Sequence, residues 1–219
     1  MNEERMHPPK EESSSTPRRS AKGRQRRVEL VHAGIACLVT EGWPGLTHRK
    51  VAQQAEATLG LVRYHFGDLA GLHTAIAEQV SHDLLGPMTD ELVSTTSVEE
   101  LIVVFLTALE AGREEPTAIQ LLIQIMVGTA YYPEVSRIVR TDLDTAKARL
   151  AAHLQELDPK WTATSALQAA SLLVATCDGI LLHGLVDPSA GNQHSRSQLH
   201  AVLRAILTSP GTGEPTPDH

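Results

Sequence analysis

Apolar residues recur three and four positions apart along most of the chain, which is the spacing of an amphipathic α-helix. The stripe Val28, Val31, Ile35 and Leu38 predicts a helix over about residues 24–41 that ends at Gly42. Similar stripes predict helices over residues 68–85, 97–112, 116–130, 134–157, 161–186 and 195–208, with Gly86-Pro87 breaking the first of them. No segment gives a convincing strand, so the predicted fold class is all-α.

Two shorter helices are predicted between residues 47 and 66 from local signals. Thr47 is a suitable N-cap for a helix over about residues 47–55, and Thr58 is a suitable N-cap for a helix over about residues 59–66. Val62 and Phe66 would hold the second helix to a core, and Gly67 would end it. Two short helices joined by a tight turn form a helix-turn-helix, whose second helix enters the major groove of DNA. The total is about nine helices.

Charge is divided unequally along the chain. The net charge is −7, yet residues 16–67 hold nine Lys or Arg against three acids. Residues 68–219 hold eight against nineteen. Basic side chains neutralise phosphates and supply most non-specific DNA affinity, so the basic segment fits the helix-turn-helix and the acidic remainder has another task.

The residues around the two short helices divide by the contact each side chain can make. Thr47, His48 and Arg49 lie at a helix start, which favours a phosphate. Arg63 is the best base reader because its guanidinium matches guanine O6 and N7. Leu59 either touches a thymine methyl or is buried. The full set expected at DNA is Lys22, Arg24, Arg27, Thr47, His48, Arg49, Thr58, Leu59, Gly60, Leu61, Arg63, Tyr64 and His65.

Residues 24–72 resemble the TetR-type (tetracycline repressor family) transcriptional regulators. The resemblance rests on the basic start, the 28–38 stripe, Glu41-Gly42-Trp43, Leu46-Thr47, Val51-Ala52, Ala55 and the run from Thr58 to Phe66. Two positions depart from the family pattern, because Arg63 replaces an aromatic residue and Leu69 replaces a frequent lysine. The resemblance implies an N-terminal three-helix DNA-binding domain and a C-terminal helical domain for ligand binding and dimerisation. It further implies a homodimer through the last two helices, a pseudo-palindromic operator in double-stranded DNA, and an unidentified small-molecule effector that releases a repressor.

The expected organisation is a disordered basic tail (1–22), a DNA-binding domain (23–67), an effector-binding and dimerisation domain (68–208) with its first helix as connector, and a loose tail (209–219). Asp178 and His183 are ionisable groups within the most apolar helix, and such groups need partners. They would sense a ligand, pair across the dimer, or lie at an exposed edge. The candidate ligand-binding residues are Phe105, Leu109, Gln120, Ile123, Gln124, Met126, Tyr131, Asp178 and His183.

Other functions have weaker support. Cys37 and Cys177 are the only cysteines and the histidines lie apart, so neither a disulfide framework nor a metal site is predicted, and no cofactor is expected. Residues 161–186 are the only candidate membrane span, but they contain Gln168, Asp178 and His183, so we expect a cytoplasmic protein without a membrane role. The alternatives are an all-α oligomerisation or small-molecule-binding module without a DNA role, and a small helical enzyme. Salt-insensitive or absent DNA binding would favour the module, and substrate turnover would favour the enzyme.

Overall fold

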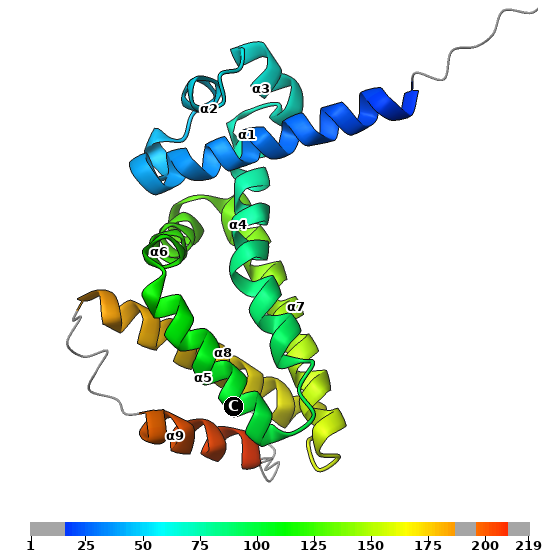
Figure 1. Cartoon of the computed structure of the whole chain (residues 1–219), viewed down its shortest axis with the longest axis vertical. Helices are drawn as coiled ribbons and strands as arrows, with labels where there is room; N and C mark the ends of the chain where they lie inside the picture. The colour runs from blue at the N-terminus through cyan, green and yellow to red at the C-terminus, as the bar shows by residue number, and fades with distance from the viewer. Residues whose placement is uncertain (1–15, 187–195, 210–219) are drawn as a thin grey trace, which may run out of the picture.

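The computed structural model describes residues 16–186 and 196–209, and within these residues it contains nine α-helices and no strand (Figure 1). The prediction of an all-α fold is therefore confirmed. The helices are α1 (Thr16–Gly45), α2 (His48–Gln54), α3 (Leu59–Phe66), α4 (Leu69–Leu92), α5 (Val98–Glu114), α6 (Pro116–Tyr131), α7 (Pro133–Leu157), α8 (Ala163–Val186) and α9 (Arg196–Thr208).

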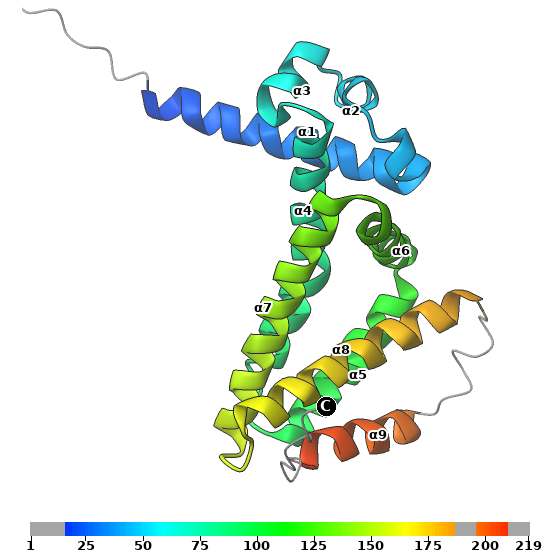
Figure 2. The same cartoon turned by 180° about the vertical axis from the view of Figure 1, so that it is seen from behind.

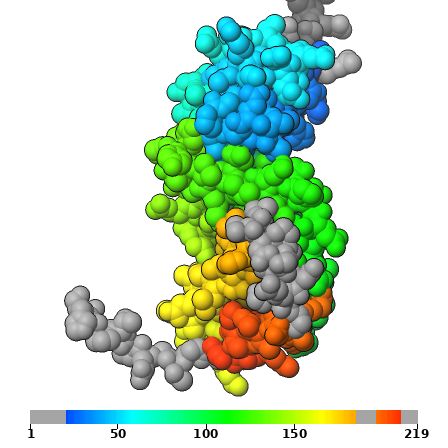
Figure 3. Space-filling view, turned by 90° about the vertical axis from the view of Figure 1, so that its left-hand side faces the viewer, coloured from blue at the N-terminus to red at the C-terminus, as the bar shows by residue number. Residues whose placement is uncertain are grey.

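The molecule is elongated, with α1, α2 and α3 at one end and α9 at the other (Figures 1 and 3). The long helices α4 and α7 lie side by side and connect the two ends, as both opposite views show (Figures 1 and 2). One buried cluster joins α1, α2 and α3 to the upper parts of α4, α6 and α7. A second cluster lies among α5, α7, α8, α9 and the end of α4. The three N-terminal helices thus share a continuous core with the connecting helices.

Helix α1 differs from the sequence prediction at its start. It begins at Thr16, so the predicted tail over residues 1–22 is wrong for residues 16–22, while residues 1–15 lie outside the described part of the chain. The predicted end at Gly42 is confirmed by its positive φ of 69°, after which a short helical turn containing Pro44 follows. Residues 16–23, TPRRSAKG, contain no large apolar residue. Apolar periodicity therefore gave no signal for this extension.

Helix α4 also continues farther than predicted. Pro87 lies inside it, and the helix runs on to Leu92. A proline removes one backbone hydrogen bond and usually kinks or ends a helix. Here Thr89 and Leu92 are buried beyond the proline, so packing of the last turns against the second cluster outweighs that cost. The connector predicted to end near Leu85 therefore spans most of the C-terminal body.

Trp43 connects the N-terminal helices to α6. Its side chain is 1% exposed, and its indole Nε1 donates a hydrogen bond to the Gln124 carbonyl oxygen at 2.6 Å. Gly128, one turn farther along α6, has no side chain where the indole lies. The Trp43 ring also meets the buried His73 ring edge-on, with ring centroids 5.3 Å apart. The end of α1 is thereby bound directly to α4 and to α6.

Helix α8 contains the one stretch among the described residues that is long and apolar enough to cross a membrane, Ala163–Gly184, with mean hydropathy 1.5. Its inner side packs in the second cluster through Ala166, Ala170 and Leu173, while Leu167 and Leu172 are exposed. Such a composition is also that of a core helix in a soluble protein, so a single helix of this kind is weak evidence for a membrane role.

Candidate functional site

The two short helices form with the caps and anchors that the sequence predicts. The Thr47 side chain accepts a hydrogen bond from the Lys50 amide at the start of α2, and Thr58 accepts one from the Leu61 amide at the start of α3. Val62 is fully buried and Phe66 nearly so, which fixes the face that α3 turns inward. The opposite face is therefore the one that α3 presents to solvent.

The turn between α2 and α3 depends on Glu56, which is the only described non-glycine residue with a positive φ, 47°. The Ala57 amide donates to the Ala52 carbonyl oxygen at 2.8 Å, and the Arg26 guanidinium donates to the Ala55 carbonyl oxygen at 3.1 Å. These bonds close the turn and attach it to α1. The turn between α2 and α3 is thus held by one backbone bond and by one bond from the Arg26 side chain.

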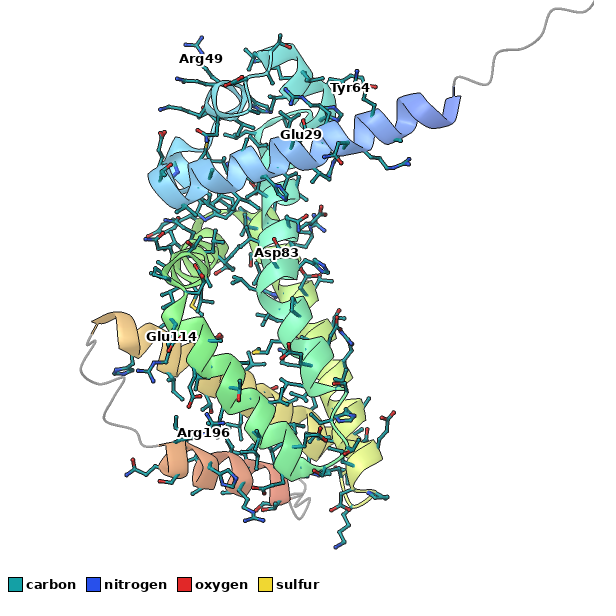
Figure 4. The ribbon with its side chains drawn as sticks, in the orientation of Figure 1. Glu29, Arg49, Tyr64, Asp83, Glu114 and Arg196 are labelled. Atoms are coloured by element: carbon teal, nitrogen blue, oxygen red, sulfur yellow. The ribbon has the colours of Figure 1, made fainter. Side chains whose placement is uncertain are left out.

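The solvent face of α2 and α3 is basic and polar. Arg49 and Arg63 are exposed, and Tyr64 is 82% exposed. Figure 4 shows Arg49 and Tyr64 at the end of the molecule farthest from α9, on α2 and α3 respectively. Neither arginine has an ion-pair or hydrogen-bond partner among the described residues. Both guanidinium groups are therefore free to bind an external anion.

The other residues predicted at DNA lie around this face with different exposures. Lys22 and Arg24 are exposed on α1, and the Arg27 guanidinium lies over the Phe66 ring at 5.5 Å. His48 is half-buried, and its buried Nε2 atom has no hydrogen-bond partner among the residues that the structure describes. The structure brings the whole predicted set to one end of the molecule. Thr58, Leu59 and Gly60 are exposed, and Thr47, Leu61 and His65 are half-buried.

Two basic residues near this face are occupied within the protein. Lys50 pairs with Glu41 at 2.9 Å, and Arg26 pairs with Glu29 at 2.6 Å. The Glu41 carboxylate raises the pKa of Lys50, and the Arg26 guanidinium lowers the pKa of Glu29. Exposed pairs of this kind add little stability, so they do not prevent a phosphate from competing. They do distinguish Lys50 and Arg26 from the unpaired Arg49 and Arg63.

The helical body contains two apolar cavities that share a wall. The α6–α7 cavity, of about 250 Å³, is lined by Ser81, Leu84, Leu85, Leu122, Ile125, Met126, Thr129, Val139, Leu143 and Asp178. The α5–α6 cavity, of about 200 Å³, is lined by Asp83, Leu84, Leu85, Met88, Ala108, Gly112, Ala118, Ile119, Leu122, Cys177, Asp178 and Leu181. Leu84, Leu85, Leu122 and Asp178 line both. Apolar walls with a few polar groups are typical of small-molecule sites.

The chain resembles known regulators over most of its length. The family profile described as the C-terminal domain of BetI-type transcriptional repressors matches residues 98–209, which is half of the chain. The chain belongs to the TetR family. Its relative BetI, an HTH-type transcriptional regulator of Burkholderia cenocepacia, is 27% identical over 189 residues, which cover 84% of this chain and 95% of the relative.

Solved structures of TetR-family proteins superpose on this chain over most of its length. Salmonella enterica GusR superposes with a TM-score of 0.69 at 20% identity, covering 84% of this chain and 95% of GusR. The multidrug binding protein EbrR complexed with ethidium superposes with a TM-score of 0.63 at 23% identity, covering 83% of this chain and 98% of EbrR. TetR-family proteins are DNA-binding transcriptional regulators that respond to ligands and act as dimers. This TetR-family chain is therefore a DNA-binding transcriptional regulator.

Within this TetR-family body, only some of the residues predicted at the ligand line the two cavities. Met126 lines the α6–α7 cavity, and Asp178 lines both. Phe105 and Leu109 are instead buried in the second cluster, and Tyr131 is 77% exposed. Gln120 and His183 are exposed, Ile123 and Gln124 are half-buried, and none of these lines either cavity.

Sequence reasoning missed the cavity residues that α4 supplies. Ser81, Leu84 and Leu85 follow the apolar stripe Leu72, Ile76 and Val80 of that helix, which was interpreted only as a connector. The available signal was the continuation of the stripe from Val80 to Leu84, but its partner helices were unknown. In this TetR-family chain the connector is also a cavity wall.

Proposed function

We propose that the protein is a homodimeric, cytoplasmic repressor that binds a pseudo-palindromic operator through α2 and α3 and is released by a small molecule in the helical body. The observation that carries this proposal is that Arg49 and Arg63 are both exposed on the solvent face of a capped helix-turn-helix, and that neither has a partner among the described residues. The curated relative is named a transcriptional regulator, which favours a regulator over a helical enzyme.

The two arginines would have different tasks. Arg49 is the second residue of α2, where free amides and the positive end of the helix dipole favour a phosphate. Arg63 lies in the middle of α3, between the buried anchors Val62 and Phe66, and projects away from the core. A guanidinium there matches the two acceptors of guanine in the major groove. Arg49 therefore positions the helix, and Arg63 reads a base.

Dimerisation would occur through α8 and α9. Helix α8 exposes Leu167 (46%) and Leu172 (54%), and α9 exposes Val202 (50%), although both helices pack on the body with their other sides. Large apolar side chains exposed on neighbouring helices are typical of an interface with another protein surface. A two-fold pair would place two α3 helices at half-sites one turn of DNA apart, roughly 34 Å.

The effector would act on both helices that join the cavities to the N-terminal end. Helix α4 supplies Ser81, Leu84 and Leu85 to the cavity wall, and α6 supplies Leu122 and Met126. Helix α4 packs on α1 and α3, and α6 holds Trp43 of α1. A ligand that favours one arrangement of these helices therefore changes the separation of the two α3 helices in the dimer.

The experiment is selection of an operator from a random DNA pool, followed by fluorescence anisotropy with every single-base variant of one half-site. Arg63→Ala is expected to relax discrimination at one base position by about 1–3 kcal/mol. Arg49→Ala is expected to weaken all sequences alike and to reduce the salt slope by about one unit.

Arg140→Ala is the matched control because it removes an exposed arginine from α7, away from the basic face. It should leave affinity and discrimination unchanged. Equal, sequence-independent losses for Arg49→Ala and Arg63→Ala would contradict the division of tasks. Absence of any DNA binding at low salt would overturn the proposed function.

A further inference from the structure

Asp178 is a carboxylate in an apolar wall without a partner. It lies on α8, is half-buried, and lines both cavities. No described residue donates a hydrogen bond to it or forms an ion pair with it. Burial raises the pKa of the Asp178 carboxyl because the apolar surroundings disfavour its charged form. A carboxylate held in this way is stabilised by any cation that enters the cavity.

Ser81 supplies a second unsatisfied polar group in the same space. Its side chain is 2% exposed, it lines the α6–α7 cavity together with Asp178, and its Oγ has no hydrogen-bond partner in the described part of the chain. A buried hydroxyl without a partner costs free energy, and a ligand that carries a hydrogen-bond donor or acceptor would remove this cost. The rest of that cavity is apolar apart from Thr129, whose hydroxyl already donates to the Met126 carbonyl oxygen.

The character of the cation follows from what else lines the two cavities. Neither lining includes Lys, Arg or His, so no positive group competes for Asp178 there. Neither includes Phe, Tyr or Trp either. Quaternary ammonium groups, which have no N–H, are recognised mainly by aromatic cages. An alkylammonium group with N–H donors instead forms charge-assisted hydrogen bonds to a carboxylate.

We propose that these cavities bind an apolar primary or secondary amine, with the ammonium group at Asp178 and Ser81 and the hydrocarbon along Leu84, Leu85 and Leu122. This inference rests on the proposed function, since it names the class of the effector. Carboxylate and phosphate ligands are disfavoured because Asp178 repels them. Neutral apolar molecules fill the cavities but leave both polar groups unsatisfied.

The test compares four probes with the same eight-carbon chain: octylamine, octyltrimethylammonium, 1-octanol and octanoate. Octylamine is an alkyl amine like the lysine side chain, so it is charged at pH 7.5. Isothermal titration calorimetry on the free full-length protein is expected to show octylamine binding at least tenfold more tightly than each of the others. A charge-assisted hydrogen bond worth about 1.5–3 kcal/mol corresponds to about 10- to 150-fold in affinity.

Variants then locate the ammonium group. Asp178→Asn keeps the side-chain shape and should reduce octylamine affinity about 10- to 150-fold while leaving 1-octanol unchanged. Asp144→Asn is the matched control, because Asp144 is exposed on α7, pairs with Lys147 at 2.8 Å and lines neither cavity. It should change octylamine affinity less than threefold. Circular dichroism confirms that each variant is folded.

The outcomes separate this inference from the proposed function. If octylamine binds no more tightly than 1-octanol, or if octyltrimethylammonium equals it, the amine site is refuted even when the protein binds its operator. An equal loss in Asp144→Asn and Asp178→Asn would also refute it. If octylamine binds as expected but neither wild type nor Asp178→Asn binds DNA, the amine site stands and the proposed regulatory function fails.

Discussion

Replacing Gly128 by alanine tests whether Trp43 binds the N-terminal helices to α6. A Cβ atom at Gly128 would lie 2.7 Å from Nε1 and Cε2 of Trp43 and 2.9 Å from Cζ2. Optimal contacts between carbon atoms are about 3.5–4.0 Å, so the indole must move by about 1 Å. Trp43 is rigid and 1% exposed, and therefore cannot rotate away into solvent.

The expected loss of stability combines three contributions. Forcing an extra methyl group into a packed core costs about 1–3 kcal/mol. Displacing the indole also weakens the hydrogen bond from Trp43 to the Gln124 carbonyl oxygen, which is worth about 1 kcal/mol. Alanine is better than glycine in a helix by about 1 kcal/mol, and this gain offsets part of the loss. The free energy of unfolding should therefore fall by about 1–3 kcal/mol.

Equilibrium unfolding in urea, followed by circular dichroism at one fixed protein concentration, measures this change. Gly23→Ala is the matched control, because Gly23 is also inside a helix but an added Cβ there meets no atom within 4 Å. That variant should be as stable as wild type or more stable, by up to about 1 kcal/mol. If Gly128→Ala behaves like Gly23→Ala, Trp43 does not lie against α6 and the direct contact between α1 and α6 is refuted.

Two further predictions concern α8. Leu172→Arg should raise the dimer dissociation constant at least about 100-fold in sedimentation velocity, because it places a charge in an apolar interface. Val103→Arg, at a similarly exposed valine of α5, should leave that constant unchanged. A monomer–dimer equilibrium unchanged by Leu172→Arg would exclude α8 from the interface. Burial raises the Asp178 pKa, so ionisation of Asp178 opposes folding, and the free energy of unfolding should fall as pH rises from the ordinary aspartate pKa through the raised one. Asp178→Asn should lack this decrease and be more stable than wild type at pH 7; a less stable variant would mean that a favourable partner holds the carboxylate.

The helix-turn-helix was predictable because its signals are local. Thr47 and Thr58 cap their helices through amides three residues away, and Val62 and Phe66 define the inner face of α3 within a single turn. Helix periodicity likewise predicted the all-α fold, since each stripe needs only some apolar partner and not a particular one. Where local signals were weak or overridden, the prediction failed, as at the start of α1 and at Pro87 inside α4.

The cavities were not predictable in the same way. Asp178 was recognisable as an ionisable group in an apolar helix, but the sequence left open whether it faces a ligand, a second subunit or solvent. Only the packing of α8 against α5, α6 and α7 places it in the cavity wall. Phe105 and Leu109 are as apolar as Leu84 and Leu122, yet the first two fill a core and the other two line a space.

The sequence by itself determined the elements: which segments are helical, which side of each is apolar, and that the basic charge belongs to the first third of the chain. The tertiary structure alone decided how those elements meet, including the contact of Trp43 with Gly128 and the position of Asp178 and Ser81 in the lining of one cavity. The physical reason is the sequence separation over which each kind of interaction acts. Caps and periodicity act over a few residues, whereas a cavity is the volume that side chains from four distant helices fail to fill.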